Sequence, residues 1–275
     1  SYNFAILNRA NGSVAKSTLS TVLHTNLENV FNAKAMSLHY VDDNNIYAGG
    51  LFGYTINGKQ IRNVIKFNTD FVIDEDYMYD TASATYKSPN AIVNKVILNS
   101  NNELFIAGNF TQVGGANHSK ITKLGSNGLV ETSFSNPSIT STYNVQGFAL
   151  DATNNVYAIA TDPSVTTTPF NATMYKISAT GTILNSEAFT TNSNYFRVIP
   201  SGNDMLLFGG YTKYGTTYTN RITKLNSTLQ VITTFNGHSG IGAGSISAIV
   251  RDANNNIYVS GSFSGYGTTP TKGIL

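Results

Sequence analysis

Residues 103–128 read ELFIAGNFTQVGGANHSKITKLGSNG, and most of this phrase recurs along the chain. It begins with an apolar segment that ends in a glycine and an aromatic residue, at residues 104–110. A Gly-rich polar connection follows, and then a short I-x-K-L segment at residues 121–124. Both apolar segments are short and rich in β-branched or aromatic residues, which predicts strands rather than helices.

The apolar phrase occurs five times at a nearly constant period. Its last residues are Phe52, Phe110, Asp162, Tyr211 and Phe263, which lie 58, 52, 49 and 52 residues apart. The third copy departs most from the pattern, because it ends in an acid instead of an aromatic residue. Several short strands repeated at such a period are typical of a β-propeller, in which each repeat forms one antiparallel blade.

Each repeat divides into four strand segments. An apolar run precedes an Asn-rich turn, the quoted phrase comes second, the I-x-K-L segment third, and a fourth segment ends in Phe134, Phe189 or Phe235. The turns between segments one and two and between three and four are rich in Asn and Gly. These residues tolerate the positive φ of tight hairpins. The connection between segments two and three is longer. Residues 27–36 are the one candidate helix.

The repeats predict a single domain over residues 1–275. We expect five four-stranded blades at about 36–84, 88–138, 143–193, 195–240 and 242–275, with residues 1–22 completing the last blade. Residues 4–7 and 273–275 occupy overlapping positions of a third strand, so six blades or a segment of a longer propeller are the alternatives. The chain starts at Ser1 without a basic and apolar leader, and we expect a processed product or a piece of a longer protein.

The composition narrows the classes of function. Charged residues make up 12% of the 275 residues, hydrophobic residues 41%, and the formal net charge is +2. No cluster of Lys and Arg suggests nucleic-acid binding, and no apolar stretch is long enough for membrane insertion. The absence of Cys excludes a disulfide scaffold and a thiolate metal site. Abundant Gly, Asn and Thr with little charge favours an extracellular location, and no cofactor is indicated.

The repeated motif resembles the delta-60 repeat, a family of β-propellers in bacterial surface and secreted proteins and in some phage structural proteins. The resemblance rests on residues 108–111 (GNFT), 120–124 (KITKL) and 132–134 (TSF), and on the corresponding residues 209–212, 221–226 and 233–235. It implies a structural or recognition module of a bacterial cell surface or a virion. It brings no catalytic residues with it.

In a four-stranded blade, the connections between strands two and three lie at one end with the blade-to-blade connections. Variable loops on a rigid scaffold are the usual place for binding residues. This end should carry the loops at residues 54–60, 111–119, 163–173, 212–220 and 264–271. We therefore predict ligand binding by side chains of these loops, namely Tyr54, Asn117, Tyr214, Tyr218 and Tyr266. Tyr side chains combine an apolar ring with a polar tip and suit sugar faces or protein surfaces.

An acidic stretch at residues 74–80 contains Asp74, Asp76 and Asp80 and is a weak candidate for a cation site. Its spacing does not match a calcium-binding loop, so we expect a solvated acidic loop and no metal. Three further acids, Asp42, Asp151 and Asp252, recur beside the Asn-rich turns. We expect them to stabilise these turns through hydrogen bonds to the backbone.

The sequence favours a non-catalytic module that binds a glycan or protein through the long-loop end, or that contacts neighbouring domains of a larger assembly. The four histidines are scattered and no nucleophile motif is present. Two alternatives stay open. One is a propeller hydrolase with axial acidic residues and a metal, and the other is an architectural spacer without a ligand.

Overall fold

The structure is a computed structural model that describes residues 5–7, 13–17, 34–140, 142–164, 169–192, 196–235, 240–242, 244–252, 254–267 and 269–270. The chain forms two compact units, Ser1–Asn136 and Pro137–Leu275, and their division falls between the second and third repeats. The expected single domain and its blade boundaries stay predictions. The candidate helix at 27–36 lies largely outside the described residues.

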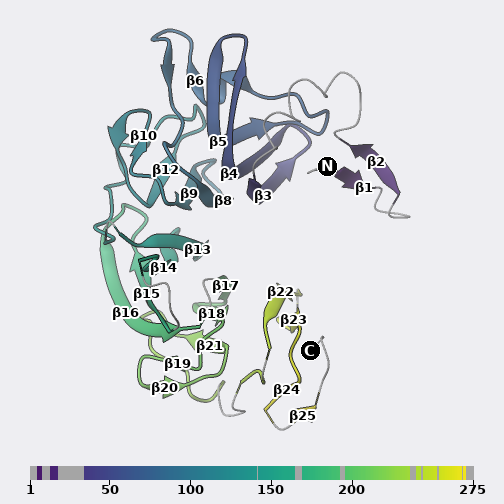
Figure 1. The fold of residues 1–275 in the computed structure, drawn as a ribbon, viewed down its shortest axis with the longest axis vertical. Coiled ribbons are helices and arrows are strands. Elements are labelled where there is room, and N and C mark those ends of the chain that lie inside the picture. Colours follow the sequence, from purple (N-terminus) through teal and green to yellow (C-terminus); the bar gives the residue numbers. More distant parts are fainter. Residues whose placement is uncertain are drawn as a thin grey trace. The chain divides into compact units, whose positions relative to one another are not determined.

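The first unit consists of antiparallel strands (Figure 1). Two three-stranded sheets, β3-β4-β5 and β8-β9-β12, form the first and second repeats, and the pair β1-β2 precedes them. The strands are β1 (Ala5–Leu7), β2 (Val14–Ser17), β3 (Lys34–Asp42), β4 (Asn45–Ile56), β5 (Lys59–Phe67), β6 (Tyr79–Asp80), β7 (Thr85–Tyr86), β8 (Val93–Leu98), β9 (Leu104–Gly108), β10 (Gln112–Val113), β11 (Ala116–Asn117) and β12 (Ile121–Leu124). The pairing of β1 with β2 confirms two N-terminal strands; their place in the last blade stays a prediction.

The second unit contains the one complete four-stranded blade in the described ranges, the sheet β13-β14-β15-β16 (Figure 1). The fourth repeat forms β17-β18-β21, and the fifth forms β22-β23. The strands are β13 (Asn144–Leu150), β14 (Val156–Thr161), β15 (Phe170–Ile177), β16 (Ile183–Thr191), β17 (Phe196–Ser201), β18 (Asp204–Gly209), β19 (Lys213–Tyr214), β20 (Thr217–Tyr218), β21 (Ile222–Leu225), β22 (Ile246–Arg251), β23 (Ile257–Gly261), β24 (Gly265–Tyr266) and β25 (Thr269–Pro270).

Among the described residues of the first four repeats, the fourth segment is a full strand only in the third, which differs from the expectation of four strands in every blade. In the second repeat it is reduced to a bridge between Leu124 and Val130, after which a turn brings Phe134 inward. Phe134 is buried and packs edge-on against Phe105, with ring centroids 5.7 Å apart. In this repeat a buried aromatic side chain on a turn covers the part of the sheet that a fourth strand would cover. The repeat that departs most in sequence is therefore the most regular in structure.

Six of the described turns share one arrangement. Asp151 is an example: its Oδ1 accepts hydrogen bonds from the backbone N–H groups of Thr153 and Asn155, both at 2.9 Å, and Asn154 has a φ of 63°. The same side-chain bonds to the second and fourth following residues occur at Asn68, Asn99, Ser178, Asn226 and Asp252. Short oxygen-bearing side chains favour such turns because they replace a backbone acceptor. The predicted turn role is confirmed for Asp151 and Asp252, and Asp42 accepts the Asn44 N–H at 2.8 Å.

In the second, third and fourth repeats, the second segment is a buried inner strand of its sheet, whereas β23 of the fifth repeat is only partly buried. All residues of β9 and β14 are buried, because these strands are covered on both faces. A Cβ atom at Gly108 would overlap the carbonyl oxygen of Ile92, and one at Gly261 would overlap that of Ser245. At both positions the recurring glycine therefore allows neighbouring backbones to approach.

The only helix in the described residues is the three-residue 3-10 helix η1 (Glu75–Tyr77). No helix in these ranges has the length or the apolar character that crossing a membrane requires.

Candidate functional site

Three of the predicted long loops are small hairpins with tight turns. Residues 111–119 contain β10-β11, residues 212–220 contain β19-β20, and residues 264–271 contain β24-β25. Their turns use glycines with positive φ, such as Gly115 at 78° and Gly215 at 55°. Residues 54–60 are the end of the β4-β5 hairpin, which turns at Asn57-Gly58. Residues 165–168 of the remaining loop lie outside the described residues.

Tyr214 is buried, which corrects the expectation of an exposed ring. Only 2% of the residue is accessible, and its ring lies 5.1 Å from that of Phe189. Successive residues of a strand point to opposite faces, so β19 turns Lys213 outward and Tyr214 into the core. Val113 is equally buried at the same place in β10. Tyr214 therefore anchors its hairpin, and burial raises the pKa of its hydroxyl.

The other predicted binding residues are distributed over separate hairpins. Tyr218 is 68% exposed, and the Lys213 ammonium lies 4.2 Å from its ring centroid. Tyr266 is half-buried, and burial raises its pKa. Asn117 is exposed in β11, and Tyr54 pairs with Ile61 in the β4-β5 hairpin. Tyr214 and Tyr218 share a hairpin, and their role as a binding surface stays a prediction.

The carboxylates of the acidic stretch at residues 74–80 form local hydrogen bonds and ion pairs. Asp74 caps η1 by accepting the Tyr77 N–H at 3.2 Å, and its other oxygen lies 3.1 Å from Lys66 Nζ. Asp76 pairs with Lys59 at 2.9 Å. A hydrogen bond from the Ser83 hydroxyl, at 2.6 Å, lowers the pKa of Asp80. In the described part of the chain, no group of three His, Asp or Glu side chains could hold a metal ion.

A groove of about 370 Å³ opens at the loop end of the first unit. It is bordered by the β4-β5 hairpin, the β6-β7 hairpin with its following segment, and the turn of β10-β11. The lining residues are Gln60, Arg62, Ala84, Thr85, Tyr86, Ser88, Pro89, Asn90, Gly114 and Gly115. Two of these segments belong to the predicted loops 54–60 and 111–119. Sequence reasoning missed Tyr86, which is 47% exposed, because it lies in a connection between repeats.

The groove has a rigid base and an exposed aromatic wall. Asn90 holds the base: its Oδ1 accepts the N–H groups of Thr111 and Gln112, at 2.9 and 3.1 Å. The ring of Tyr86 is held edge-on by Tyr79, with centroids 5.7 Å apart. Arg62 is exposed on β5. An exposed ring beside amide and guanidinium donors can bind both the apolar face and the hydroxyls of a sugar.

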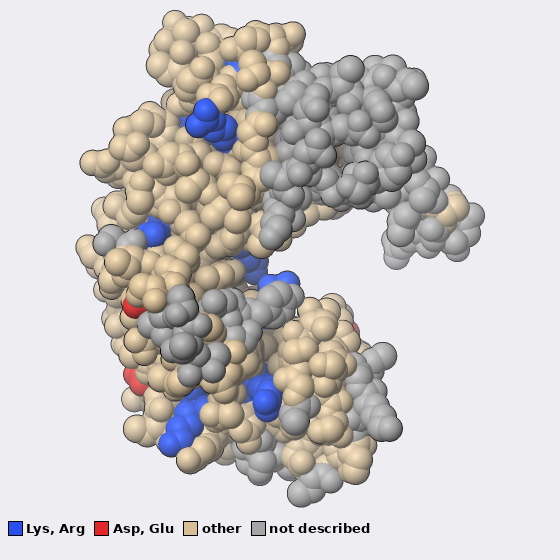
Figure 2. Space-filling view, viewed as in Figure 1, with Lys and Arg blue, Asp and Glu red and all other residues tan. Residues whose placement is uncertain are grey.

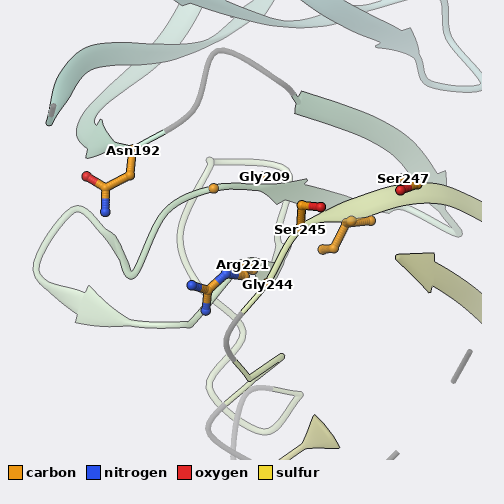
Figure 3. Close-up of a pocket in the computed structure, with 8 residues that line it drawn as sticks. Asn192, Gly209, Arg221, Gly244, Ser245 and Ser247 are labelled. Carbon is orange, nitrogen blue, oxygen red and sulfur yellow. The ribbon is translucent and has the colours of Figure 1, made fainter. Parts of the chain in front are cut away.

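A second pocket, of about 570 Å³, lies within the second unit (Figure 3). Its walls come from the segment after β16, the end of β18, the start of β21, and the beginning of β22. The lining residues are Asn192, Gly209, Gly210, Arg221, Gly244, Ser245, Ile246 and Ser247. The described lining residues include no carboxylate; their polar groups are one guanidinium, one amide and two hydroxyls.

The described residues on the face in Figure 2 are mostly uncharged, with some Lys and Arg and a few Asp and Glu side chains among neutral ones. Several lysines are paired with acids, as in Lys123–Glu103 at 2.7 Å and Lys224–Asp204 at 3.1 Å. Within the described ranges, no carboxylate forms an ion pair with Arg62 or Arg221, and both arginines line a pocket.

Comparison with known proteins supports the fold class. Residues 100–134 match the model of a β-propeller domain of unknown function, DUF5122. These residues include the whole repeated phrase at residues 103–128, and with the antiparallel blades they identify the fold as an all-β β-propeller. A search of curated proteins gives no match. A solved structure, an endo-arabinase from Bacteroides thetaiotaomicron VPI-5482, is 13% identical over 89% of this chain and 93% of that chain, with a TM-score of 0.39.

Proposed function

We propose that the chain is a recognition module that binds a glycan at the loop end of its blades. The observation that carries this proposal is the groove of the first unit, where the exposed Tyr86 ring stands beside Arg62 and Gln60. The groove volume of about 370 Å³ is within the range of small-ligand sites, roughly 300–1,000 Å³. Its apolar wall and its few hydrogen-bonding groups suit a sugar ring better than a flat protein surface.

The setting that we propose is a bacterial cell surface or a phage particle. The support is the low charge, the absence of Cys and the abundance of hydroxyl and amide side chains. The delta-60 resemblance points the same way. In this setting the module binds without catalysis, and its rigid blades hold the groove residues in place.

Glycan-array binding of the wild-type chain and Tyr86→Ala tests the proposal. Removal of a stacking ring should reduce binding about tenfold, since aromatic contacts contribute about 1 kcal/mol or more. Tyr40→Ala is the matched control, because Tyr40 is 59% exposed in the same unit but lies beside the turn between β3 and β4. Equal binding by the wild type and Tyr86→Ala would exclude the groove. Binding of protein extracts in place of glycans would favour a protein ligand.

A further inference from the structure

Arg221 lines the pocket of the second unit and has an unusual backbone conformation. Asn220 and Arg221 have φ angles of 41° and 71°, in the left-handed region that side chains other than Asn and Gly avoid. The Arg221 carbonyl accepts the Gly209 N–H at 3.1 Å, and its own N–H donates to the Tyr211 carbonyl at 2.8 Å. These two bonds hold the residue between β18 and β21. The backbone position from which the cation extends is therefore set by the blade.

The residues that correspond to Arg221 in the first two repeats also have a positive φ. Lys120 has a φ of 69° and makes the equivalent bonds to Gly108 and Phe110, at 2.9 Å each. Asn63 occupies this position in the first repeat with a φ of 61°, and its side chain accepts the Phe52 N–H at 3.2 Å. Asn tolerates this conformation, whereas Lys and Arg are strained by about 1 kcal/mol or more. The backbone alone would favour Asn or Gly, so the choice of a cation needs another cause.

The contacts of the guanidinium leave most of its donors for a ligand. Nη1 donates to the Ile241 carbonyl at 3.2 Å, and an arginine has five N–H donors. Two described acids of the unit have other partners: Asp204 pairs with Lys224, and Asp252 accepts the turn bonds from Asn254 and Asn256. A half-buried cation with no carboxylate partner among the described residues favours binding of an anion.

The rest of the pocket favours a sugar over a simple ion. Figure 3 shows the Asn192 amide, the Ser245 hydroxyl and the Arg221 guanidinium coming from separate segments. The Ser245 hydroxyl already lies 3.0 Å from that of Ser262, which fixes its position. A volume of about 570 Å³ exceeds the needs of an inorganic ion and suits a ring with several hydroxyls.

We propose that this pocket binds an acidic sugar, with its carboxylate on the Arg221 guanidinium and its hydroxyls on Asn192 and Ser245. The inference rests on the proposed glycan recognition and names the class of glycan. A guanidinium matches a carboxylate with two parallel hydrogen bonds, which gives both affinity and orientation. A uronic or sialic acid unit of a surface polysaccharide provides this combination of groups.

The test is titration calorimetry of the whole chain with oligogalacturonate, alginate oligomers and sialyllactose. At least one should bind, and methyl esterification of its carboxylates should weaken binding about tenfold or more, because the ester removes the charge-assisted bonds. Arg221→Gln should cause a similar loss, and Arg221→Lys a smaller one. Lys213→Gln is the matched control, because it removes a positive charge from an exposed site of the same unit. Tight binding of sulfated or phosphorylated sugars with no binding of carboxylated ones would overturn the proposal.

Arg221→Asn separates ligand binding from structure. Asn accepts the left-handed backbone, so the Tm of this variant should equal or exceed that of the wild type while acidic-sugar binding is lost. A lower Tm would show that the guanidinium serves the fold and would overturn the inference. Unchanged affinity in Arg221→Asn and Arg221→Gln, combined with loss of glycan binding in Tyr86→Ala, would refute this site and leave the proposed function standing. No binding by the wild type to any of the carboxylated sugars would also refute it.

Discussion

The rings of Phe189 and Tyr214 lie 5.1 Å apart, and this contact joins the last strand of the third repeat to the β19-β20 hairpin of the fourth. Phe196 and Tyr211 complete the cluster, with centroids 5.9 and 5.6 Å from that of Phe189. The Tyr211 hydroxyl donates to the Leu207 carbonyl at 2.7 Å. The Tyr214 hydroxyl is buried and has no hydrogen-bond partner among the described residues.

Tyr214→Phe should therefore stabilise the protein. A buried hydroxyl without a partner costs about 1–3 kcal/mol, so its removal should raise the free energy of unfolding by about 1 kcal/mol. Tyr214→Ala should lower it by about 3–5 kcal/mol through the cavity that it leaves. Urea unfolding of the two variants measures both changes. A loss of stability in Tyr214→Phe would mean that the hydroxyl has a partner.

The Glu103–Lys123 pair should make stability depend on pH. Burial raises the pKa of Glu103, but hydrogen bonds from Lys123 and Asn99 outweigh it and hold the pKa below the ordinary 4.5. A lowered folded-state pKa stabilises the protein above about pH 4.5, and this contribution is lost as the pH falls through the folded-state value. Lys123 is only 7% exposed at its side chain, so Glu103→Gln should cost about 2–4 kcal/mol at pH 7.

Urea unfolding at pH 7 and pH 3 checks this prediction. The wild type should lose more stability between the two values than Glu103→Gln does. Asp204→Asn is the control, because the side chains of its pair with Lys224 are 27% and 26% exposed and the cost should be smaller. Equal pH dependence of the wild type and Glu103→Gln would contradict the assignment.

Gly108→Ala should destabilise the second repeat. The added methyl group would overlap the Ile92 carbonyl and force the strands apart, at a cost of about 1–3 kcal/mol or more. Gly147→Ala is a control, since its Cβ would lie 3.5 Å from the nearest atom, the Phe196 carbonyl oxygen. Thermal unfolding of the two variants should give a clearly lower Tm for Gly108→Ala. Similar Tm values would show that the two backbones can separate freely.

Two residues with positive φ should respond in opposite ways to replacement by Gly. Ala84 is exposed at a φ of 52°, so Ala84→Gly should relieve strain and stabilise by up to about 1 kcal/mol. Leu229 has a φ of 65° but is 2% exposed, so Leu229→Gly loses core packing worth about 2–5 kcal/mol. Unfolding free energies of the two variants should differ in sign. A stabilised Leu229→Gly would mean that backbone strain exceeds burial there.

Local signals explain what could be predicted from the sequence. The repeat period, the order of the strands and the role of the turn acids could be predicted because each depends on interactions within a few residues of the chain, as at Asp151. The burial of Tyr214 could not be predicted, because a two-residue strand gives no alternation from which to choose the inner face. The reduced fourth strand depends on Phe134 reaching Phe105, a contact between strands that the pattern does not encode.

The candidate sites, too, were predicted only in part. The loop end was predicted, but Tyr86 and Arg62 meet only through the arrangement of three hairpins. Arg221 carries one signal that could have been noticed. It occupies the position of Asn63 and Lys120 in the repeat. Because the backbone conformation is the same at all three positions, the change of residue type indicates a role for the side chain.

The side-chain turns also bear on how the chain acquires its fold. In each turn a side-chain oxygen accepts hydrogen bonds from the backbone N–H groups two and four residues later, as at Asp151. These turns therefore form from local contacts alone. Low contact order speeds folding, and pairs such as β15-β16 are expected to form soon after they leave the ribosome. A nascent chain of this kind can assemble blade by blade, which limits the time its sheet edges are open to aggregation.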